Sequence, residues 1–161
     1  MFTATSPDQM PDIEMMLSMS GLEFMQAMRD GHVSRPPISA LMNYTLDTVE
    51  AGKVVFRGVP EFQHTNPAGG VHGGWYGTLL DSCMSCAVMT VTPKGSVYTT
   101  LEYKVNLTGA IPVGAEIIAT GTIDHAGRST GVSSGEIRDA KSGKLYATGS
   151  ATCLIMQRHK D

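Results

Sequence analysis

The residue best suited to chemistry in this 161-residue chain is Asp81, a carboxylate inside a long apolar stretch. That stretch, GWYGTLLDSCMSCAVM over residues 74–89, is apolar nearly all round, which is typical of a buried helix. A carboxylate in an apolar setting is costly unless it is hydrogen-bonded, paired or used in a reaction. Thr78 and Ser85 lie at helical spacing from Asp81, so their hydroxyls, or a partner subunit, could hold it as a structural acid. The alternative is a catalytic carboxylate.

A glycine-rich turn precedes this helix and supplies a second chemical feature. Four of the six residues over 69–74, GGVHGG, are glycine, so the backbone can approach a ligand closely there. A helix N-terminus has free N–H groups and a partial positive charge, which places Gly73 and Gly74 to stabilise an oxyanion. An aspartate in a partly apolar site can activate water as a general base or attack as a nucleophile. Together, these features suit hydrolysis of an activated acyl group.

The spacing of these two features predicts an oligomer. Asp81 lies eight residues beyond Gly73, which corresponds to roughly 12 Å along a helix axis. One chain can hardly aim both groups at the same carbonyl. We therefore expect them to come from two subunits related by a two-fold axis, in a dimer with two equivalent sites.

Other polar residues near the turn complete the candidate site. Asn66 and His72 belong to the turn, and Thr99 and Thr100 lie on the strand that follows the helix. His72 is interpreted as a hydrogen-bonding residue, because His64, His72 and an aspartate at this spacing form no zinc motif. Threonine favours strands in any case, so Thr99 and Thr100 as plain strand residues remain an alternative.

Composition limits the class of protein. At 17.1 kDa the chain fits one domain, and 42% hydrophobic against 17% charged residues indicates a compact chain that can also bury surface in an oligomer. A net charge of −3 and the absence of a basic run argue against nucleic acid. No apolar run reaches membrane-spanning length and no signal peptide is visible, so a cytoplasmic location is expected. Three cysteines, two of them in a C-x-x-C, are interpreted as buried thiols rather than disulfides or zinc ligands.

The remaining pattern predicts an α+β architecture, with an antiparallel sheet wrapped around one long helix. Residues 1–19 are interpreted as a loose N-terminal arm or a short helix at most, and residues 20–161 as a single domain that opens with a short capped helix over 20–31. Pro36 and Pro37 are expected to break any helix. Strands are expected over residues 44–49, 53–59, 96–107, 116–124, 130–138 and 145–155.

Two of these strands carry more specific expectations. Over 96–107 strict alternation places Thr100 on the face opposite Tyr103. The last strand presents only small side chains on one face, so a helix could lie close against it there. The residues of that face are Ala147, Gly149, Ala151 and Cys153.

The motif N-x-x-x-x-x-H-G-G, followed by T-L-L-D and then by T-T-L-E-Y-K-V-N on a strand, resembles the PaaI-like branch of the hotdog-fold acyl-CoA thioesterases. The resemblance extends over about residues 36 to 155. It implies a hotdog fold, in which five to six antiparallel strands wrap a central helix, and dimers that often pair into tetramers. It also implies thioester hydrolysis without a metal or redox cofactor, with coenzyme A present only as part of the substrate.

The resemblance implies roles for individual residues. The Gly73 amide would polarise the thioester carbonyl, while Asp81 of the opposite subunit would activate or replace the attacking water. Asn66 would orient the water or the acyl group, His72 would brace the turn, and Thr100 would hydrogen-bond the water.

The same resemblance places Arg128 and Ser129 where the family often contacts the nucleotide end of coenzyme A, although a solvated turn residue is the alternative for Arg128. This chain differs from the family in the segment that follows Val105 and Asn106. The family usually has an aromatic residue and then Arg-Pro there, whereas this chain reads LTGAIP over 107–112. That difference affects the loop that borders the coenzyme A channel.

Two other functions remain alternatives. A hotdog dehydratase is disfavoured because no histidine follows Asp81 within the helix. A non-catalytic acyl-CoA sensor would have no need of a carboxylate at this position. Aryl, phenylacetyl-like and medium-chain acyl groups all remain open, as do coenzyme A and an acyl carrier protein as the carrier. The depth of the acyl tunnel is expected to depend on Trp75, Tyr76, Met84 and the N-terminal helix.

Overall fold

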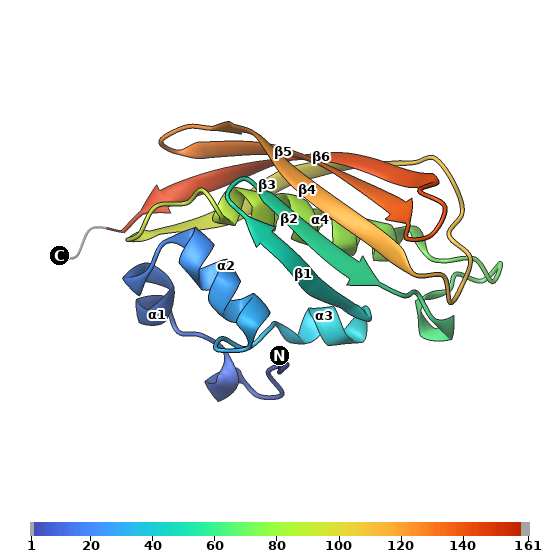
Figure 1. Cartoon of the computed structure of the whole chain (residues 1–161), viewed down its shortest axis with the longest axis horizontal. Helices are drawn as coiled ribbons and strands as arrows, with labels where there is room; N and C mark the ends of the chain where they lie inside the picture. The colour runs from blue at the N-terminus through green and yellow to red at the C-terminus, as the bar shows by residue number, and fades with distance from the viewer. Residues whose placement is uncertain (1, 159–161) are drawn as a thin grey trace.

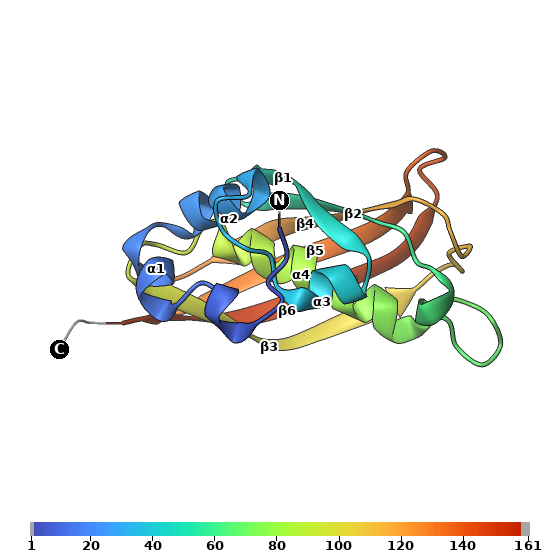
Figure 2. The ribbon, with the colours of Figure 1, turned by 90° about the horizontal axis from the view of Figure 1, so that it is seen from below.

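The computed structural model, which describes residues 2–158, has one curved sheet that wraps around a long helix (Figures 1 and 2). The helices are α1 (Ile13–Ser18), α2 (Gly21–Asp30), α3 (Pro37–Leu41) and α4 (Gly73–Met89), with 3-10 turns at Pro7–Gln9 and Phe62–His64. The strands are β1 (Tyr44–Glu50), β2 (Lys53–Gly58), β3 (Ser96–Leu107), β4 (Ile117–Ala126), β5 (Thr130–Asp139) and β6 (Leu145–Gln157). This arrangement confirms the predicted α+β hotdog fold. Within residues 2–158 no helix is both long enough and apolar enough to cross a membrane.

The sheet is antiparallel throughout, with the strand order β1-β2-β4-β5-β6-β3. Strands β4, β5 and β6 form the predicted meander, whereas β3 joins it on the far side of β6. The strand β3 therefore lies at one edge of the sheet, with one side of its backbone free for another strand. Helices α1 to α3 lie on the side of α4 that the sheet leaves open (Figure 2).

The helix α4 packs directly on the backbone of the sheet because a row of glycines crosses three strands. Gly121, Gly135 and Gly149 are register partners on β4, β5 and β6. A Cβ at Gly121 would lie 2.0 Å from the carbonyl oxygen of Cys83, and one at Gly135 would lie 2.7 Å from Cγ of Met84. The small residues expected on β6 are buried against the helix as predicted, namely Ala147, Ala151 and Cys153.

Replacing Gly121 with alanine is expected to lower the free energy of unfolding by about 1–3 kcal/mol or more, because the new methyl group meets main-chain atoms. Thermal or denaturant unfolding measures this loss. Gly127→Ala is the matched control, since its nearest obstacle is the ring of the exposed His125, at 3.2 Å, which can move aside. Equal stability of the two variants would show that α4 does not depend on the glycine row.

The N-terminal segment has the second of its two expected forms, a short helix. It contains α1, and Thr3 forms a bridge with Arg35. The hydroxyl of Ser34 also donates to the carbonyl of Gln9, at 2.6 Å. No helix runs through the two prolines: α2 ends at Asp30, and the short helix α3 begins at Pro37, where the missing N–H has no intrahelical partner to lose.

The capping box predicted for the N-terminal helix is present. The Ser20 hydroxyl accepts from the Glu23 amide, and the Glu23 carboxylate accepts from the Ser20 amide. A Cβ at Gly21 would lie 1.8 Å from the carbonyl oxygen of Met89. The start of α2 is therefore fixed against the last turn of α4.

A β-bulge in β3 changes which side chains face α4. Pairing with β6 skips Leu101, so strict alternation is interrupted there. As a result Thr100 and Tyr103 both face the helix: Thr100 binds Asp81, and the hydroxyl of Tyr103 lies 3.5 Å from a Cβ placed on Gly77. The prediction that Thr100 and Tyr103 occupy opposite faces is therefore wrong.

Candidate active site

Asp81 lies near the middle of α4 and faces β3. Its Oδ1 atom accepts a hydrogen bond of 3.0 Å from Oγ1 of Thr100. The carboxylate is half-buried, and burial raises the pKa of Asp81 above its usual range, while the hydrogen bond from Thr100 lowers it in part. A carboxylate with a raised pKa is a better proton acceptor, and that property suits a general base.

The two hydroxyls on the helical face of Asp81 do not hold it. Thr78 donates to the carbonyl of Gly74 at 2.9 Å, and Ser85 donates to the carbonyl of Ser82 at 3.5 Å. Among residues 2–158 only Thr100 hydrogen-bonds the Asp81 carboxylate, and Oδ2 receives no hydrogen bond from them. The arrangement leaves one carboxylate oxygen available to a water molecule.

Thr100→Val is expected to move the acidic limb of the pH–rate profile to higher pH. The change keeps the shape of the side chain but removes the donor that lowers the pKa of Asp81, so protonation would disable the carboxylate at a higher pH. Measurements of kcat/KM across the acidic range test this. Thr122→Val, an exposed threonine on β4, is the control and should leave the limb in place. An unmoved limb in Thr100→Val would contradict the assignment.

The turn before α4 is held by its own side chains. Oδ1 of Asn66 accepts from the amides of Ala68 and Gly70, at 3.0 and 3.2 Å. The backbone N–H of Asn66 in turn donates to the carbonyl of Gly70, at 2.8 Å. The side-chain NH2 of Asn66 donates to no other group in the described part of the chain, so it can donate to a ligand.

His72 caps α4. Its Nδ1 accepts from the amide of Gly74 at 2.9 Å, so the proton of the neutral ring is assigned to Nε2. The Gly74 amide is thereby occupied. The Gly73 amide has no acceptor among residues 2–158, so it can donate to a ligand.

His64 is a structural residue of the turn that the sequence analysis missed. The ring is buried and accepts from the Glu61 amide through Nδ1, at 2.9 Å. Its Nε2 lies 2.8 Å from the carbonyl oxygen of Leu41, and its own carbonyl accepts from the His72 amide, at 2.8 Å. The partner Leu41 is 23 residues away, so no local spacing could indicate this role.

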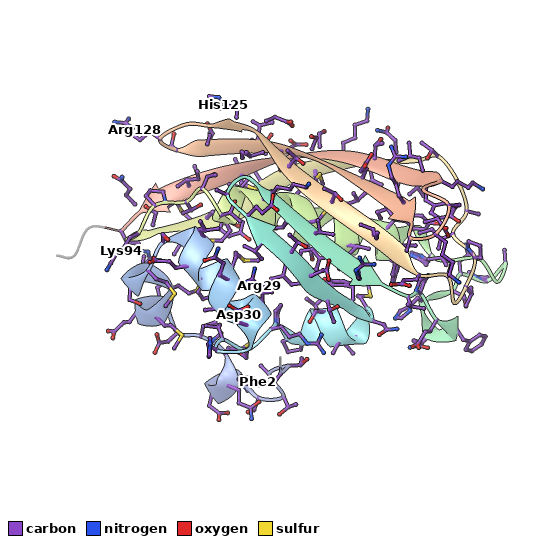
Figure 3. The ribbon with its side chains drawn as sticks, viewed as in Figure 1. Phe2, Arg29, Asp30, Lys94, His125 and Arg128 are labelled. Atoms are coloured by element: carbon purple, nitrogen blue, oxygen red, sulfur yellow. The ribbon has the colours of Figure 1, made fainter. Side chains whose placement is uncertain are left out.

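The predicted coenzyme A contacts lie apart from Asp81. Thr99 is exposed and lies on the face of β3 opposite Thr100. Arg128 and Ser129 are exposed in the turn between β4 and β5, and Arg128 lies at the same end of the molecule as Lys94, which follows α4 (Figure 3). One chain therefore brings Asp81 together with Thr100, but places the Gly73 amide about 12 Å away along the helix.

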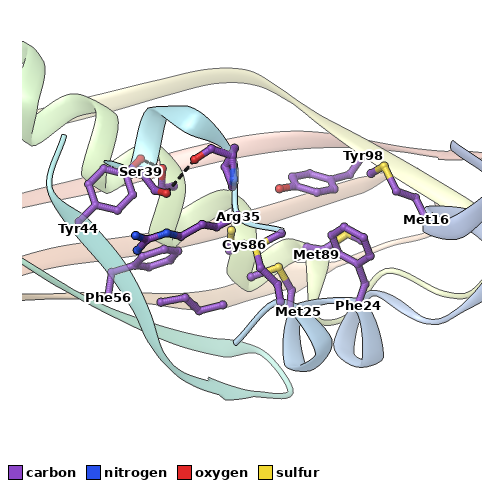
Figure 4. A pocket seen from close by; sticks show the side chains of 14 residues that line it. Met16, Phe24, Met25, Arg35, Ser39, Tyr44, Phe56, Cys86, Met89 and Tyr98 are labelled. Atoms are coloured by element: carbon purple, nitrogen blue, oxygen red, sulfur yellow. Dashed lines mark hydrogen bonds between the residues drawn. The ribbon is translucent and has the colours of Figure 1, made fainter. Parts of the chain in front are cut away.

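A cavity of about 180 Å³ lies between α4, the strands β1 and β2 and the N-terminal helices (Figure 4). Ser82, next to Asp81, lines it and shares a hydrogen bond of 2.8 Å with the hydroxyl of Tyr44. Burial raises the pKa of Tyr44 to about 12, and the charge of Asp81 contributes to the rise. The residues that line the cavity are Met16, Phe24, Met25, Met28, Arg35, Pro36, Ser39, Tyr44, Leu46, Phe56, Ser82, Cys86, Met89 and Tyr98.

The walls of this cavity differ in part from the expectation. The N-terminal helix contributes as predicted, through α2. Trp75, Tyr76 and Met84 are buried but do not line the cavity. Met84 packs against Gly135 and Gly149 of the sheet, and the Tyr76 hydroxyl accepts from the Ile111 amide at 2.8 Å. Trp75 is on the same side of α4 as Ser82 but nearer the start of the helix, where its ring N–H donates to the Met42 carbonyl at 2.8 Å.

The cysteines are buried or nearly so. Cys86 lines the cavity, and burial raises the pKa of its thiol to about 12. Cys83 and Cys153 are fully buried and unpaired. Within residues 2–158 no cluster of three or more histidine, cysteine, aspartate or glutamate side chains is arranged to hold a metal ion.

Comparison with known proteins agrees with this geometry. Residues 68–146 match the model of the thioesterase superfamily. Mouse acyl-coenzyme A thioesterase 13 is 30% identical over 112 residues, which are 70% of this chain and 79% of the mouse protein. The chain belongs to the thioesterase superfamily. It is a hotdog-fold thioester hydrolase.

Solved structures of other thioesterases extend the match over most of the chain. A phenylacetic acid degradation-related protein from Ralstonia eutropha superposes with a TM-score of 0.74 at 25% identity, over 81% of this chain and 98% of that one. Zebrafish thioesterase superfamily member 2 gives a TM-score of 0.69 at 26% identity, over 85% and 99% of the two chains. This thioesterase therefore shares almost the full length of these relatives.

Proposed function

We propose that the protein hydrolyses a small aryl or medium-chain acyl-CoA to the free acid and coenzyme A. The observation that carries this proposal is the half-buried Asp81 carboxylate, with a raised pKa and one unoccupied oxygen. The proposal is supported by relatives that are named acyl-coenzyme A thioesterases. An acyl-CoA sensor would bind the same ligand, but a carboxylate of this kind has no use in binding alone.

We also propose a homodimer, and the arrangement of β3 supports it. The strand runs antiparallel along α4, so that successive residues of one element lie beside successive residues of the other. The neighbours are Thr100 and Asp81, Tyr103 and Gly77, and Leu107 and Gly73. Gly77 lies midway between Gly73 and Asp81. A two-fold axis near Tyr103, with two β3 edges paired, would therefore bring the Gly73 amide of one chain toward the Asp81 carboxylate of the other.

The free edge of β3 has the surface that such a pairing needs. The strand β3 is long, with twelve residues, and it has three exposed apolar side chains. These are Leu101 (58% exposed), Tyr103 (46%) and Leu107 (54%). A long edge strand with exposed apolar side chains is a template for pairing with another chain. Pairing would bury these side chains, and two such dimers could associate further into a tetramer.

In the proposed site each chain supplies a different part of the chemistry. The Gly73 amide donates to the thioester carbonyl oxygen and stabilises the negative charge that develops on it. Asp81 of the other chain either takes a proton from the attacking water or attacks the carbonyl itself to form an acyl-aspartyl anhydride that water then hydrolyses, and both roles need the ionised carboxylate. Thr100 holds that carboxylate, and the free NH2 of Asn66 orients the water or the acyl group. The thiolate of coenzyme A is the leaving group.

The remaining predicted residues are proposed to contact coenzyme A rather than the reacting carbonyl. Arg128 and Ser129 would bind its nucleotide end from the exposed β4–β5 turn, and Thr99 and Gly74 would contact other parts of the substrate. His72 acts indirectly, because its bond to Gly74 fixes the first turn of α4. An acyl carrier protein is the alternative carrier.

Thiol release from a panel of aryl and medium-chain acyl-CoA thioesters tests this proposal directly. We expect turnover of at least one panel member, and light scattering should report a dimer or a tetramer. Detection of both free coenzyme A and the free acid identifies the reaction as hydrolysis rather than transfer. Tight binding of the same thioesters without thiol release would replace the proposal with the sensor function.

A further inference from the structure

Arg35 is the one charged side chain among the described residues that line the cavity. It enters from the segment between α2 and α3, and in Figure 4 its side chain runs along the wall toward Tyr44 and Phe56. The rest of the lining is mostly methionine, phenylalanine and other apolar groups. Arg35 is partly buried, and the loss of water around its guanidinium favours pairing with an anion or a set of acceptors.

The protein supplies Arg35 with only part of that compensation. Its Nε donates to the hydroxyl of Thr3. Within residues 2–158 no carboxylate lies in salt-bridge range of its guanidinium, whereas Arg29, Arg57 and Arg138 all have acidic partners. The two terminal nitrogens of Arg35 therefore keep their donors for a ligand, in the fork geometry that matches a carboxylate.

The other polar groups of the cavity already have partners. The hydroxyls of Tyr44 and Ser82 bind each other, and the hydroxyl of Ser39 donates to the carbonyl of Pro36, at 2.8 Å. These bonds leave the guanidinium as the group with unused donors along an otherwise apolar path. A ligand that fills the cavity would thus be apolar along its length and negatively charged where it meets Arg35.

The volume of the cavity limits the size of that ligand. A cavity of about 150 Å³ lined by apolar side chains binds benzene, so one of about 180 Å³ holds a single ring or a short chain of roughly six carbons. The phosphates of coenzyme A are too large and too strongly charged for a wall that offers one cation. The acyl group can enter instead, because Ser82, the residue that follows Asp81 in α4, lines the cavity.

We propose that the acyl group carries a carboxylate at the end remote from the thioester, and that Arg35 binds this carboxylate. This inference rests on the proposed thioesterase function and names its substrate class: thioesters of short dicarboxylic acids or of a carboxylated single ring. Arg35 is a specificity residue in this assignment and takes no part in the hydrolysis itself.

The test compares adipoyl-CoA with hexanoyl-CoA, two six-carbon thioesters that differ only in the terminal carboxylate. We expect the native protein to prefer adipoyl-CoA by about tenfold or more in kcat/KM, since a charge-assisted hydrogen bond contributes about 1.5–3 kcal/mol. Arg35→Gln should remove the preference by lowering kcat/KM for adipoyl-CoA, and Arg35→Lys should retain part of it. Arg57→Gln is the control, because Arg57 is exposed on β2 and pairs with Asp47 and Glu116.

Several outcomes would overturn the inference. If the native protein does not prefer adipoyl-CoA, the inference is wrong, and this result needs no variant. If a folded Arg35→Gln protein still prefers adipoyl-CoA, the inference is also wrong. If neither thioester is hydrolysed, binding of the two is compared by calorimetry instead, and the proposed function itself fails only if no member of the acyl-CoA panel releases thiol. Tighter binding of adipoyl-CoA that depends on Arg35 would support the carboxylate site, and equal binding would exclude it.

Discussion

Asp81→Asn and Asp81→Ala are each expected to lower turnover of an acyl-CoA substrate by on the order of a hundredfold or more. Neither side chain can take a proton from water or attack the carbonyl, so the loss should appear in kcat rather than only in KM. The asparagine side chain would keep an oxygen that can accept from Thr100, which makes Asp81→Asn the milder structural change. Thiol release under saturating substrate measures the effect.

The same two variants should remain folded, and Asp81→Asn should be no less stable than the native protein at neutral pH. Burial raises the pKa of Asp81 in the folded state, so the ionised form costs stability at any pH above that raised pKa. The asparagine removes this cost. Thermal unfolding at neutral pH provides the comparison.

Asp124→Asn is the matched control for activity. Asp124 is an exposed carboxylate on β4 that accepts from Ser134, at 3.0 Å, on the outer face of the sheet. Its replacement makes the same chemical change away from the site and should leave turnover unchanged. If Asp81→Asn retained native turnover, the aspartate would be structural and the hydrolytic mechanism proposed above would be wrong.

Gly73→Pro is the second change with a large expected effect, because it removes one amide N–H and little else. Proline is favoured at the first position of a helix, which Gly73 occupies. His72, before it, already has the extended conformation that proline requires, with φ −64° and ψ 138°. Loss of one oxyanion donor typically lowers kcat by about 10²–10³-fold, and we expect a loss of this order.

Gly73→Ala is the matched control, since it adds a side chain but retains the N–H. A Cβ at this position would meet only Cδ1 of Leu107, at an ordinary contact distance of 3.5 Å. The alanine variant should therefore keep most of the activity. Comparable losses in the two variants would show that bulk at this position, rather than the missing donor, is responsible.

The two inactive variants also test whether each site is shared between chains. When Asp81→Asn and Gly73→Pro chains are co-expressed in equal amounts, half of the dimers should be mixed, and each mixed dimer should have one intact site. Activity should then return to about a quarter of the native value. If both groups acted on one substrate from the same chain, co-expression would restore nothing.

The local pattern of the sequence predicted the framework well. The capping box of α2, the strands and the apolar helix with its glycine turn all depend on short spacings, and the structure has each of them close to the predicted bounds. Small residues along β6 correctly indicated close helix packing, although the partners Gly121 and Gly135 could be recognised only from the register between strands.

Features that depend on long-range contacts could not be predicted in this way. No glycine or proline marks the bulge at Leu101, yet this extra residue turns Thr100 toward Asp81. The anchoring role of His64 depends on Leu41, from a different element. Arg35 gave no signal in the sequence either, because it meets the cavity only when the N-terminal segment folds over α4.

The glycine row under α4 fixes the position of the Asp81 carboxylate independently of the residues that shape the cavity. Because the helix rests on main-chain atoms of the sheet, its depth and axial position do not depend on the sizes of neighbouring side chains. The cavity, by contrast, has walls from flexible methionines of the N-terminal helices, several of them outside the segment that matches the superfamily model. Substitutions in those helices can therefore retune the accepted acyl group while the carboxylate stays in place, which makes this part of the chain the natural starting point for engineering new substrate ranges.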